Sequence, residues 1–244
     1  MSTVVTRGMV LAAGLGERMR PITATLPKPL VQVGGKTLLD HALDRLSAAG
    51  VTEVVVNVHH LADRIVQHLE GRHEPEVRIS AEQDRLETGG GVAKALPMLG
   101  NEPFYVSNGD TLWLDGATPA LRRLASQWDH SRMDALLLVF PGARAEGYEG
   151  AGDFVLDPLG QARRRREREV APFVFTGVQL LHPHLFRDAP DGPFSLNLLY
   201  DRAAEAGRLY AIVHDGMWLH IGTPEAIGAA EDYLRDRRLL GRFP

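Results

Sequence analysis

The chain has 244 residues, of which 44% are hydrophobic and 24% are charged, and its formal net charge is -4. This balance is ordinary for a folded globular protein, argues against a disordered or membrane-embedded chain, and gives no reason to expect nucleic acid or an anionic membrane as a partner. Cysteine is absent, which excludes disulfides and thiolate metal sites. No secretory signal or apolar stretch of about 20 residues is visible. We therefore expect one cytoplasmic domain over residues 1–244, as a monomer or small homo-oligomer.

Along the first hundred residues, short continuous apolar runs alternate with segments in which apolar residues recur at helical spacing. Strands and helices that alternate in this way predict a parallel sheet wound with crossover helices, and hence an α/β fold. Gly50 is expected to close the first helix. The expected elements are a strand at Met9–Ala13, a helix over Thr37–Leu46, a strand at Val51–Val58, a helix over Leu61–Leu69, a strand at Val77–Ile79 and a helix over Val92–Leu99.

The second half of the chain is predicted to add shorter strands and three helices. Gly142–Asp153 is a glycine-rich connection that we expect to serve as a mobile lid, and the run Arg163–Arg168 is typical of a solvated face or an alternating strand. The expected strands are Phe104–Val106, Ala135–Phe140, Val174–Leu180, Ala211–Val213 and Met217–Leu219, and the expected helices are Pro119–Leu124, Ser195–Ala206 and Thr223–Leu234.

A glycine loop follows the first predicted strand. Gly14 and Gly16 remove side chains where a backbone approaches a ligand closely or takes a positive φ. Arg18 and Lys28 then supply cations, and an Arg fork with a Lys point charge suits a polyphosphate. Ligands of parallel sheets bind beyond the carboxyl ends of the strands, where this loop is expected to lie. Met19 stands where the dinucleotide fingerprint needs a third glycine, which disfavours an NAD-dependent oxidoreductase.

A carboxylate follows a later strand at a similar place. Asp110 comes directly after Gly109, beyond the apolar run Phe104–Val106. A carboxylate at the carboxyl end of a strand is well placed to hold Mg²⁺ against phosphate oxygens, although an Asp there also caps turns. The sequence therefore makes Asp110 a candidate magnesium ligand.

The stretch from Leu11 to Leu30 resembles a known signature. It contains L-A-A-G-x-G-x-R-M-R-P-x-T followed by P-K-P-L, which closely resembles the signature of the sugar-1-phosphate nucleotidyltransferases, the enzymes that join a nucleoside triphosphate to a sugar phosphate. The resemblance covers nearly the whole chain. It implies a single Rossmann-like α/β domain with a mostly parallel mixed sheet flanked by helices. It also implies attack by a sugar-1-phosphate oxygen on the α-phosphorus of a nucleoside triphosphate, with release of pyrophosphate.

The resemblance implies roles for the charged residues near the loop. Arg18 would hold the β- and γ-phosphates and the departing pyrophosphate. Lys28 would bridge the α-phosphate and the incoming sugar phosphate, and Asp110 would anchor Mg²⁺. Further nucleotide contacts are expected from Leu11, Ala12, Ala13, Gly14, Gly16 and Asn108.

The segment L-E-T-G-G-G at Leu86–Gly91 resembles the family segment that faces the nucleobase and ribose. Glu82 and Gly89 are the expected base contacts, because a carboxylate or a backbone amide can bind the polar edge of a base. Gln83 is the alternative for the same role. Without the resemblance, a flexible loop with a helix cap is the simpler interpretation of this segment.

Later segments are expected to form the sugar side of the site. Asp153 lies in a Gly-Asp-Phe segment that is expected to border the sugar pocket, and Thr176-Gly177 resembles a family strand whose T-G backs the sugar. Asn197, at the start of a predicted helix, is a further sugar-binding candidate. Glu167 and Glu169 fall near a family acidic residue that bonds sugar hydroxyls, but neither is assigned that role.

His220 marks a departure from the family pattern. Trp218–Pro224 resembles W-x-D-x-G-T-P, whose Asp is the second metal ligand, but position 220 is His. A neutral imidazole can coordinate a divalent ion, or it can bind phosphate through its N–H while Asp110 alone holds the metal. A structural histidine bonded to backbone is the third possibility.

Within the family, the compact length and the L-E-T-G-G-G segment are most similar to members that act on UTP and N-acetylmuramate 1-phosphate in peptidoglycan recycling. The lactyl carboxylate of that sugar needs a cation, which one of Arg163–Arg166 or Arg144 is expected to supply. Transfer from GTP to mannose 1-phosphate is the alternative. A nucleotide-sugar sensor without catalysis also stays open, because His220 replaces the usual Asp.

Overall fold

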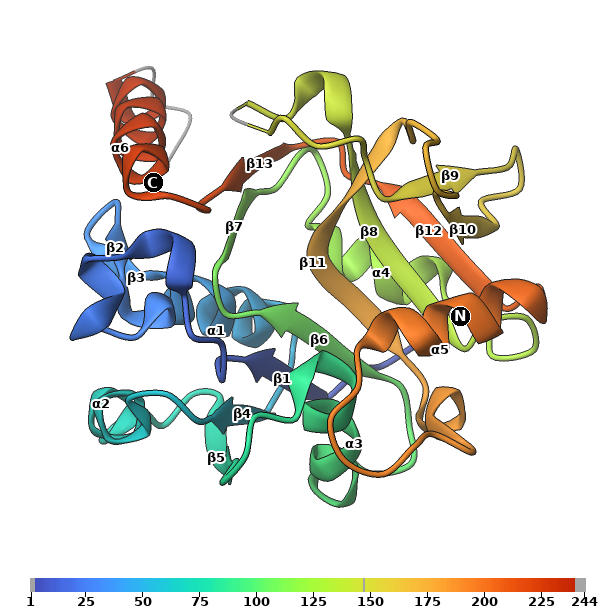
Figure 1. Cartoon of the computed structure of the whole chain (residues 1–244), viewed down its shortest axis with the longest axis horizontal. Coiled ribbons are helices and arrows are strands. Elements are labelled where there is room, and N and C mark those ends of the chain that lie inside the picture. The colour runs from blue at the N-terminus through green and yellow to red at the C-terminus, as the bar shows by residue number, and fades with distance from the viewer. Residues whose placement is uncertain (1–2, 147, 240–244) are drawn as a thin grey trace.

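The computed structural model describes residues 3–146 and 148–239, and its centre is a nine-stranded mixed sheet (Figure 1). The strands of this sheet are β1 (Arg7–Leu11), β4 (Glu53–Val58), β5 (Glu76–Ala81), β6 (Phe104–Asn108), β8 (Ala135–Pro141), β9 (Phe154–Leu156), β10 (Ala162–Arg164), β11 (Phe173–Leu181) and β12 (Leu209–Val213). Their order is β10-β9-β11-β6-β1-β4-β5, with β8 paired to β11 and β12 paired to β8.

Helices and two short ribbons surround the sheet. The ribbons pair β2 (Gln32–Val33) with β3 (Lys36–Thr37) and β7 (Thr111–Leu114) with β13 (Met217–His220). The α-helices are α1 (Leu38–Ala48), α2 (Ala62–Leu69), α3 (Glu87–Leu99), α4 (Ala120–Gln127), α5 (Leu196–Glu205) and α6 (Pro224–Leu239), and the 3₁₀ turns are η1 (Glu17–Met19), η2 (Ile22–Ala24), η3 (Lys28–Leu30), η4 (Gly142–Arg144) and η5 (Pro183–Phe186).

The parallel part of the sheet is built from β5, β4, β1 and β6, and the crossover helices α1, α2 and α3 connect these strands in chain order. This arrangement confirms the expected α/β fold with a mixed sheet. Leu11 at the end of β1 lies opposite Asn57 of β4 and Asn108 of β6. Because chain order reverses on either side of β1, the carboxyl ends of β1 and β6 form the edge where ligands of such folds bind.

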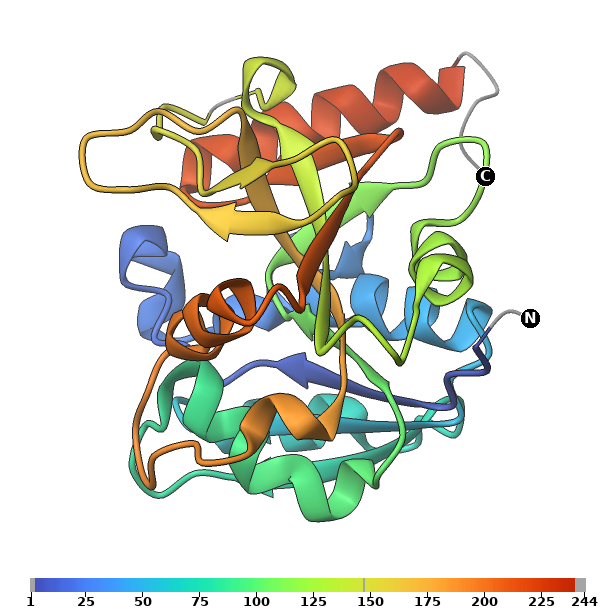
Figure 2. The same cartoon turned by 90° about the vertical axis from the view of Figure 1, so that its right-hand side faces the viewer.

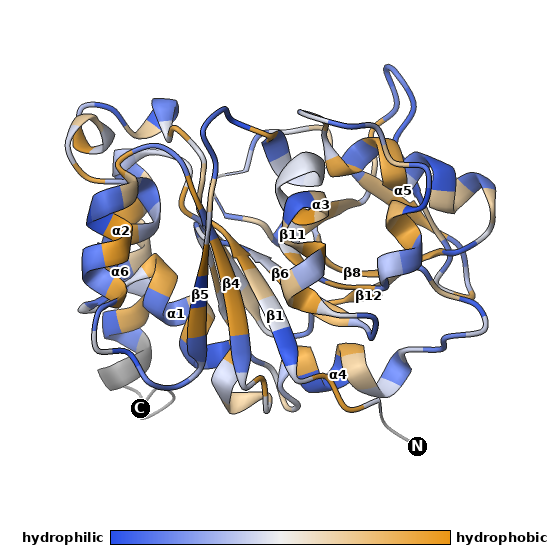
Figure 3. Cartoon of the chain, turned by 90° about the horizontal axis from the view of Figure 1, so that it is seen from below, coloured by the Kyte–Doolittle hydropathy of each residue, from blue (hydrophilic) through white to orange (hydrophobic). Residues whose placement is uncertain are grey.

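Helices cover both faces of the sheet. Figure 3 shows α1, α2 and α6 on one side of the strands and α3 and α5 on the other. Successive side chains of β4 point to opposite faces of the sheet and so enter two different apolar clusters. Val54 and Val56 pack with α1 and α2 on one face, whereas Val55 packs with α3 on the other. A third apolar cluster joins the β7–β13 ribbon to α6 through residues such as Leu112, Leu219 and Leu234. Figure 2 shows α6 (red) and α3 (green) at opposite ends of the molecule.

Two predicted boundaries differ from the structure in informative ways. The first strand is Arg7–Leu11, two residues earlier than the expected Met9–Ala13. Arg7 can enter the strand because it forms an ion pair with Glu53 on β4, and the strand ends because the Ala12 N–H donates to the Asn57 side chain at 2.8 Å. Helix α3 begins at Glu87 instead of Val92, so the three glycines lie inside the helix.

Close packing explains why α3 contains three consecutive glycines. A Cβ atom on Gly89 would lie 2.3 Å from the Phe194 ring, and one on Gly90 would lie 2.4 Å from the Gly192 carbonyl oxygen. One on Gly91 would lie 2.9 Å from the side chains of Asn57 and Glu82. The glycines therefore let α3 approach its neighbours, which a helix-interior glycine permits at a cost of about 1 kcal/mol in propensity.

The other predicted helices and strands are present, whereas the short strands β2, β3, β7 and β9 were not predicted. Thr37 caps α1 by accepting a hydrogen bond from the Asp40 N–H, and Gly50 follows that helix with φ +95°. Helix α6 begins at Pro224 as expected but continues past Leu234 to Leu239. The arginine run forms a strand only at Ala162–Arg164. Among the helices of the described part of the chain, none combines the length and apolar character that crossing a bilayer requires.

Candidate active site

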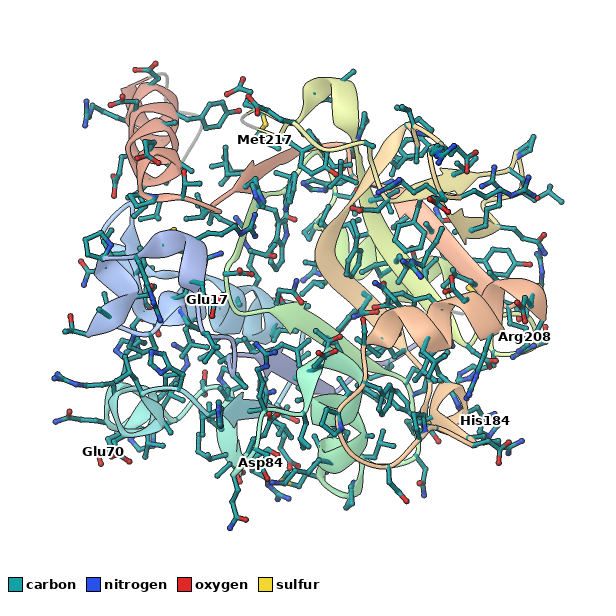
Figure 4. All side chains as sticks on the ribbon, viewed as in Figure 1. Glu17, Glu70, Asp84, His184, Arg208 and Met217 are labelled. Atoms are coloured by element: carbon teal, nitrogen blue, oxygen red, sulfur yellow. The ribbon has the colours of Figure 1, made fainter. Side chains whose placement is uncertain are left out.

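A cavity of about 640 Å³ opens at the carboxyl ends of β1 and β6. Its lining combines backbone of the glycine loop, carboxylates of which Asp110 pairs with Lys28, and residues at the starts of α3 and α5. Glu17, one of the lining residues, is labelled in Figure 4. The predicted site residues that line this cavity are Leu11, Ala12, Ala13, Gly14, Gly16, Arg18, Lys28, Glu82, Asn108 and Asp110.

Gly14 and Gly16 have different structural roles in the loop. Gly16 has φ +64°, and a Cβ atom there would lie 2.9 Å from Thr23 and 3.1 Å from Lys28. Thr23 also donates a hydrogen bond to the Gly16 carbonyl oxygen at 2.8 Å, which fixes the turn. A Cβ atom on Gly14 would meet nothing within 4 Å, so Gly14 leaves backbone open toward the cavity. Gly16 shapes the loop, and Gly14 keeps its surface accessible.

Lys28 and Asp110 form the charged centre of the cavity. The Lys28 ammonium donates to Asp110 Oδ2 at 2.6 Å. The Lys28 side chain is 10% exposed and comes from η3, whereas the Asp110 side chain is 37% exposed and follows β6. Gly109 sets the position of Asp110, because its N–H donates to the Leu11 carbonyl oxygen at 2.8 Å and a Cβ atom there would lie 2.8 Å from that same oxygen.

Two further cations line the cavity. Arg18 lies in η1, and Arg85 lies in the loop before α3. Both side chains are exposed, and within residues 3–146 and 148–239 neither forms an ion pair with a carboxylate. They are therefore available to an anionic ligand. Arg85 was not predicted from the sequence, because a single Arg in a polar loop carries no pattern.

A buried hydrogen-bond network links the glycine loop to the segment before α3. The Ala12 N–H donates to Asn57 Oδ1 at 2.8 Å, and Asn57 Nδ2 donates to Glu82 Oε1 at 2.7 Å. Glu82 Oε2 in turn accepts from the Leu86 N–H at 3.0 Å. Glu82 therefore fixes the loop around the cavity, and its contact with a nucleobase stays a prediction. Sequence reasoning missed Asn57, although an Asn at the end of a buried valine strand was a usable signal.

The structure corrects the expectation for Gly89. Its N–H donates to the Phe194 carbonyl oxygen at 2.8 Å, and the residue does not line the cavity. The Gly89 amide is thus used inside the protein and does not face a base. Gln83 is exposed but also lies outside the lining. Thr88 lines the cavity, and its hydroxyl accepts a hydrogen bond from the Leu196 N–H at 3.0 Å.

His220 lies near the charged centre. It ends β13, opposite Thr111 of β7, and so stands beside the residue that follows Asp110. Burial lowers the pKa of His220, as do the charges of Lys28 and Arg18, whereas Asp110 raises it. The imidazole is therefore neutral near pH 7 in the free protein. Gly222 lines the cavity and lies against the imidazole, since a Cβ atom on Gly222 would be 2.5 Å from His220 Nε2.

The residues present suit Mg²⁺ bound together with a substrate. Within the described residues, no three His, Cys, Asp or Glu side chains come together as a metal cage. Mg²⁺ is commonly held by one or two carboxylates with substrate phosphates and water completing its shell. Asp110 supplies a carboxylate on the cavity wall, next to three cations that suit phosphate. The oxygen donor fits Mg²⁺, and direct ligation by His220 stays a prediction.

Of the predicted sugar-binding residues, Asp153 and Asn197 line a second, smaller cavity of about 310 Å³.

The structure corrects the expectation for Thr176. Its hydroxyl is buried and donates to the Leu138 carbonyl oxygen at 2.7 Å, so it holds β11 to β8 and does not face a substrate. Gly177 has φ +85° and lies at an irregularity of β11, where a Cβ atom would lie 2.5 Å from Thr111 Oγ1. It is needed for packing and lines neither cavity.

The fold and the cavity together define a nucleotide-binding α/β protein: a glycine loop, a Lys–Asp pair and unpaired arginines converge at the edge where β1 and β6 end. Residues 8–222 match the family model of the MobA-like NTP transferase domain, and the chain belongs to this family. The resemblance seen in the sequence is thereby confirmed at the level of the nucleotidyltransferases.

The chain is similar to curated proteins of at least two kinds. The chain is 44% identical over 241 residues to an N-acetylmuramate alpha-1-phosphate uridylyltransferase from Caulobacter vibrioides, with 97% of this chain and 100% of that one covered. It is 36% identical over 221 residues to a protein of the same name from Neisseria meningitidis, with 89% and 93% covered. A mannose-1-phosphate guanyltransferase from Aspergillus fumigatus is 27% identical, with 90% of this chain and 61% of that one covered.

Solved structures share the fold. A UDP-glucose pyrophosphorylase complexed with UDP-glucose superposes with a TM-score of 0.82 at 17% identity, covering 96% of this chain and 100% of that one. HddC from Yersinia pseudotuberculosis complexed with GMP-PN gives a TM-score of 0.74 at 24% identity, covering 94% and 99%. At these identities the likeness shows the fold, and it confirms the predicted Rossmann-like architecture.

Proposed function

We propose that this protein transfers UMP from UTP to N-acetylmuramate α-1-phosphate, releasing pyrophosphate, in peptidoglycan recycling. The observation that carries the proposal is the 44% identity that extends over all of the Caulobacter vibrioides uridylyltransferase. The cavity supports it chemically, because its lining includes cations and a carboxylate suited to Mg²⁺. Such a transfer depends on positioning and on neutralising phosphate charge more than on a protein nucleophile.

Arg18, Lys28 and Asp110 have separate roles in the transfer. Arg18 holds the β- and γ-phosphates and stabilises the pyrophosphate as it leaves. Lys28 follows the α-phosphate and the incoming sugar phosphate as a point charge, which its single ammonium group suits. Asp110 holds Mg²⁺, which supplies Lewis-acid polarisation of the phosphates when bound. The sugar phosphate is already ionised near pH 7, so no strong general base is required.

The backbone of the loop orients the nucleotide. Ala12 and Ala13 are buried and Gly14 is exposed at the cavity wall, so the chain presents backbone to the ligand at this point. The Asn57–Glu82 network keeps the loop in one conformation, which lowers the entropy lost on binding. The neutral His220 supports the phosphates through an N–H or ligates the metal.

A pyrophosphate-release assay on the purified protein with Mg²⁺ tests the proposal. UTP, GTP, dTTP and CTP are each combined with the 1-phosphates of N-acetylmuramate, N-acetylglucosamine, glucose and mannose. Turnover confined to UTP with N-acetylmuramate 1-phosphate supports the proposal. Turnover with GTP and mannose 1-phosphate instead would match the more distant relatives, and UTP binding without release in any combination would indicate a sensor.

A further inference from the structure

The smaller cavity has the chemistry of a sugar site with an anionic substituent. It lies where β9, β10 and β11 meet the start of α5, all on the right of Figure 1. Its lining combines two aromatic rings, an amide, a carboxylate and two guanidinium groups. It adjoins the large cavity through the first turn of α5, because Ser195 lines the large cavity and Asn197 the small one. The lining residues are Asp153, Phe154, Arg164, Arg165, Phe175 and Asn197.

The arginines near this cavity differ in what already holds them. Both terminal nitrogens of Arg163 bind the Glu169 carboxylate at 2.7 Å, and Arg164 pairs with Asp201 at 2.6 Å. Arg144 stacks over Phe140 at 5.2 Å and lines neither cavity. These guanidinium groups are committed to packing or to carboxylates of the protein.

Arg165 is different from its neighbours. Its backbone is fixed, because its N–H donates to the Asp153 carbonyl oxygen at 2.8 Å. Its guanidinium is exposed and, within the part of the chain that the structure describes, donates a single long hydrogen bond of 3.4 Å, to the Glu169 backbone oxygen. Among the residues that the structure describes, it forms no ion pair. A guanidinium that extends from a fixed backbone beside a cavity, without a carboxylate partner, is ready to bind one from a ligand.

Tyr148 connects this cavity with the charged centre of the large one. Its ring packs edge-on at 6.2 Å from that of His220. Burial and the charge of Asp153 raise the pKa of Tyr148, whereas Arg165 lowers it, so the hydroxyl lies within electrostatic reach of both. Tyr148 thus packs against His220, which feels the charges of Lys28 and Asp110, and also lies within electrostatic reach of Arg165.

We propose that Arg165 binds the lactyl carboxylate of the acceptor sugar and thereby selects N-acetylmuramate 1-phosphate over sugar phosphates that lack this group. The inference rests on the proposed function and deepens it. Asp153 complements Arg165: one of its oxygens accepts from the Phe175 N–H at 2.9 Å, and its carboxylate suits sugar hydroxyls. The half-buried Phe175 offers apolar surface to the sugar ring, and the buried Phe154 packs against it at 6.2 Å.

The test compares two acceptors that differ only in the lactyl group, N-acetylmuramate 1-phosphate and N-acetylglucosamine 1-phosphate, with UTP at saturation. Arg165→Gln is expected to raise the KM for N-acetylmuramate 1-phosphate roughly 10- to 100-fold, as the loss of a charge-assisted hydrogen bond predicts. It should leave the KM for UTP and the use of N-acetylglucosamine 1-phosphate within about twofold, because neither ligand carries the carboxylate. Where the second sugar turns over too slowly, its inhibition constant replaces the KM.

Two further variants sharpen the comparison. Arg165→Lys keeps the charge and should retain part of the preference that Arg165→Gln loses. Arg166→Gln is the matched control, because Arg166 is an exposed neighbour that lines neither cavity, and it should behave as the wild type. Thermal melting of each variant serves as the check on folding, and we expect melting temperatures close to that of the wild type because the substituted residues are exposed.

The outcomes separate the two claims. If the wild type prefers N-acetylmuramate 1-phosphate and Arg165→Gln keeps that preference unchanged, the inference is wrong while the proposed function stands. The same holds if Arg165→Gln weakens both sugars equally, because the residue would then act on the shared part of the acceptor. If the wild type does not use N-acetylmuramate 1-phosphate with UTP, both claims are overturned.

Discussion

The Lys28 ammonium lies 2.6 Å from Asp110 Oδ2, and this ion pair joins the segment after the glycine loop to the end of β6. Lys28 is the more buried partner, with 10% of its side chain exposed against 37% for Asp110. The pair holds together two groups to which we assign separate tasks, phosphate binding and metal binding. The free protein therefore keeps the charges of Lys28 and Asp110 compensated before any ligand arrives.

Removing either partner of this pair should reduce kcat about 100-fold or more, the range seen when one charge-stabilising group is lost. The effects on unfolding free energy should differ. Asp110→Asn leaves a buried ammonium without its carboxylate and should cost about 1–3 kcal/mol, whereas Lys28→Met leaves a partly exposed carboxylate that water can solvate. Lys36→Met is the control, since its pair with Asp44 is largely exposed and should contribute less than about 1 kcal/mol. Full activity in Asp110→Asn would rule out its assigned role.

Gly16 and Gly14 should respond oppositely to alanine. Gly16→Ala places a methyl group 2.9 Å from Thr23 in a left-handed backbone, and it should cost about 1–3 kcal/mol of unfolding free energy. Gly14→Ala meets nothing within 4 Å and should stay within about 0.5 kcal/mol of the wild type. Urea denaturation measures both. Equal losses in the two variants would contradict the loop geometry described here.

Asn57→Ala should disturb nucleotide binding although Asn57 comes from β4. The substitution removes the acceptor of the Ala12 N–H and the donor to Glu82, leaving buried polar groups unpaired at about 1–3 kcal/mol each. We expect a raised KM for UTP with a smaller change in the KM for the sugar phosphate. Ser80→Ala on the neighbouring strand is the matched control, because its buried hydroxyl has no hydrogen-bond partner within residues 3–146 and 148–239 and its loss should be nearly neutral. A sugar KM that rises as much as the UTP KM would argue against this role.

Folding stability should fall in mildly acidic solution because of His214. Its Nε2–H donates to the carbonyl oxygens of Leu114 and Met217, and its Nδ1 has no hydrogen-bond partner among the described residues. Burial lowers the pKa of His214 from the ordinary value of 6.5. The unfolded chain then binds more protons than the folded one below pH 6.5. The stabilisation is complete above that pH and is lost as the pH falls through it.

The His214→Gln variant isolates this effect. It keeps a donor but cannot titrate, so it should lose less unfolding free energy than the wild type between roughly pH 7.5 and 5.5. Burial also lowers the pKa values of His41 and His182, so some pH dependence should remain. Denaturation curves at the two pH values provide the measurement. Identical pH dependence in the two proteins would mean that His214 is not responsible.

The local patterns of the sequence predicted most of the fold. Valine and leucine runs gave β4 and β8 because a strand buried on both faces must be apolar throughout. The boundary errors arose where tertiary contacts override local preference: Arg7 enters β1 because Glu53 lies beside it, and three glycines enter α3 because neighbours approach too closely for side chains. Neither contact is visible in the order of residues.

The site was predictable to the extent that function is carried by short segments. The glycine loop, Lys28 and Asp110 come from contiguous motifs, and the structure brings them into one cavity. Thr176 and Gly89 were misassigned because the sequence does not show that their hydroxyl and amide are already bonded inside the protein. Arg165 could not be separated from the other arginines of its run, since only the structure shows which guanidinium groups already pair with carboxylates.

The most direct test of the account is product analysis of a single reaction. UTP and N-acetylmuramate 1-phosphate are incubated with the protein and Mg²⁺, and phosphorus NMR with mass spectrometry follows every phosphorylated species. We predict that UDP-N-acetylmuramate and pyrophosphate form in equal amounts, and that Asp110→Asn abolishes both together. Release of UDP and inorganic phosphate without the sugar nucleotide, or no consumption of UTP at all, would contradict the proposed transfer.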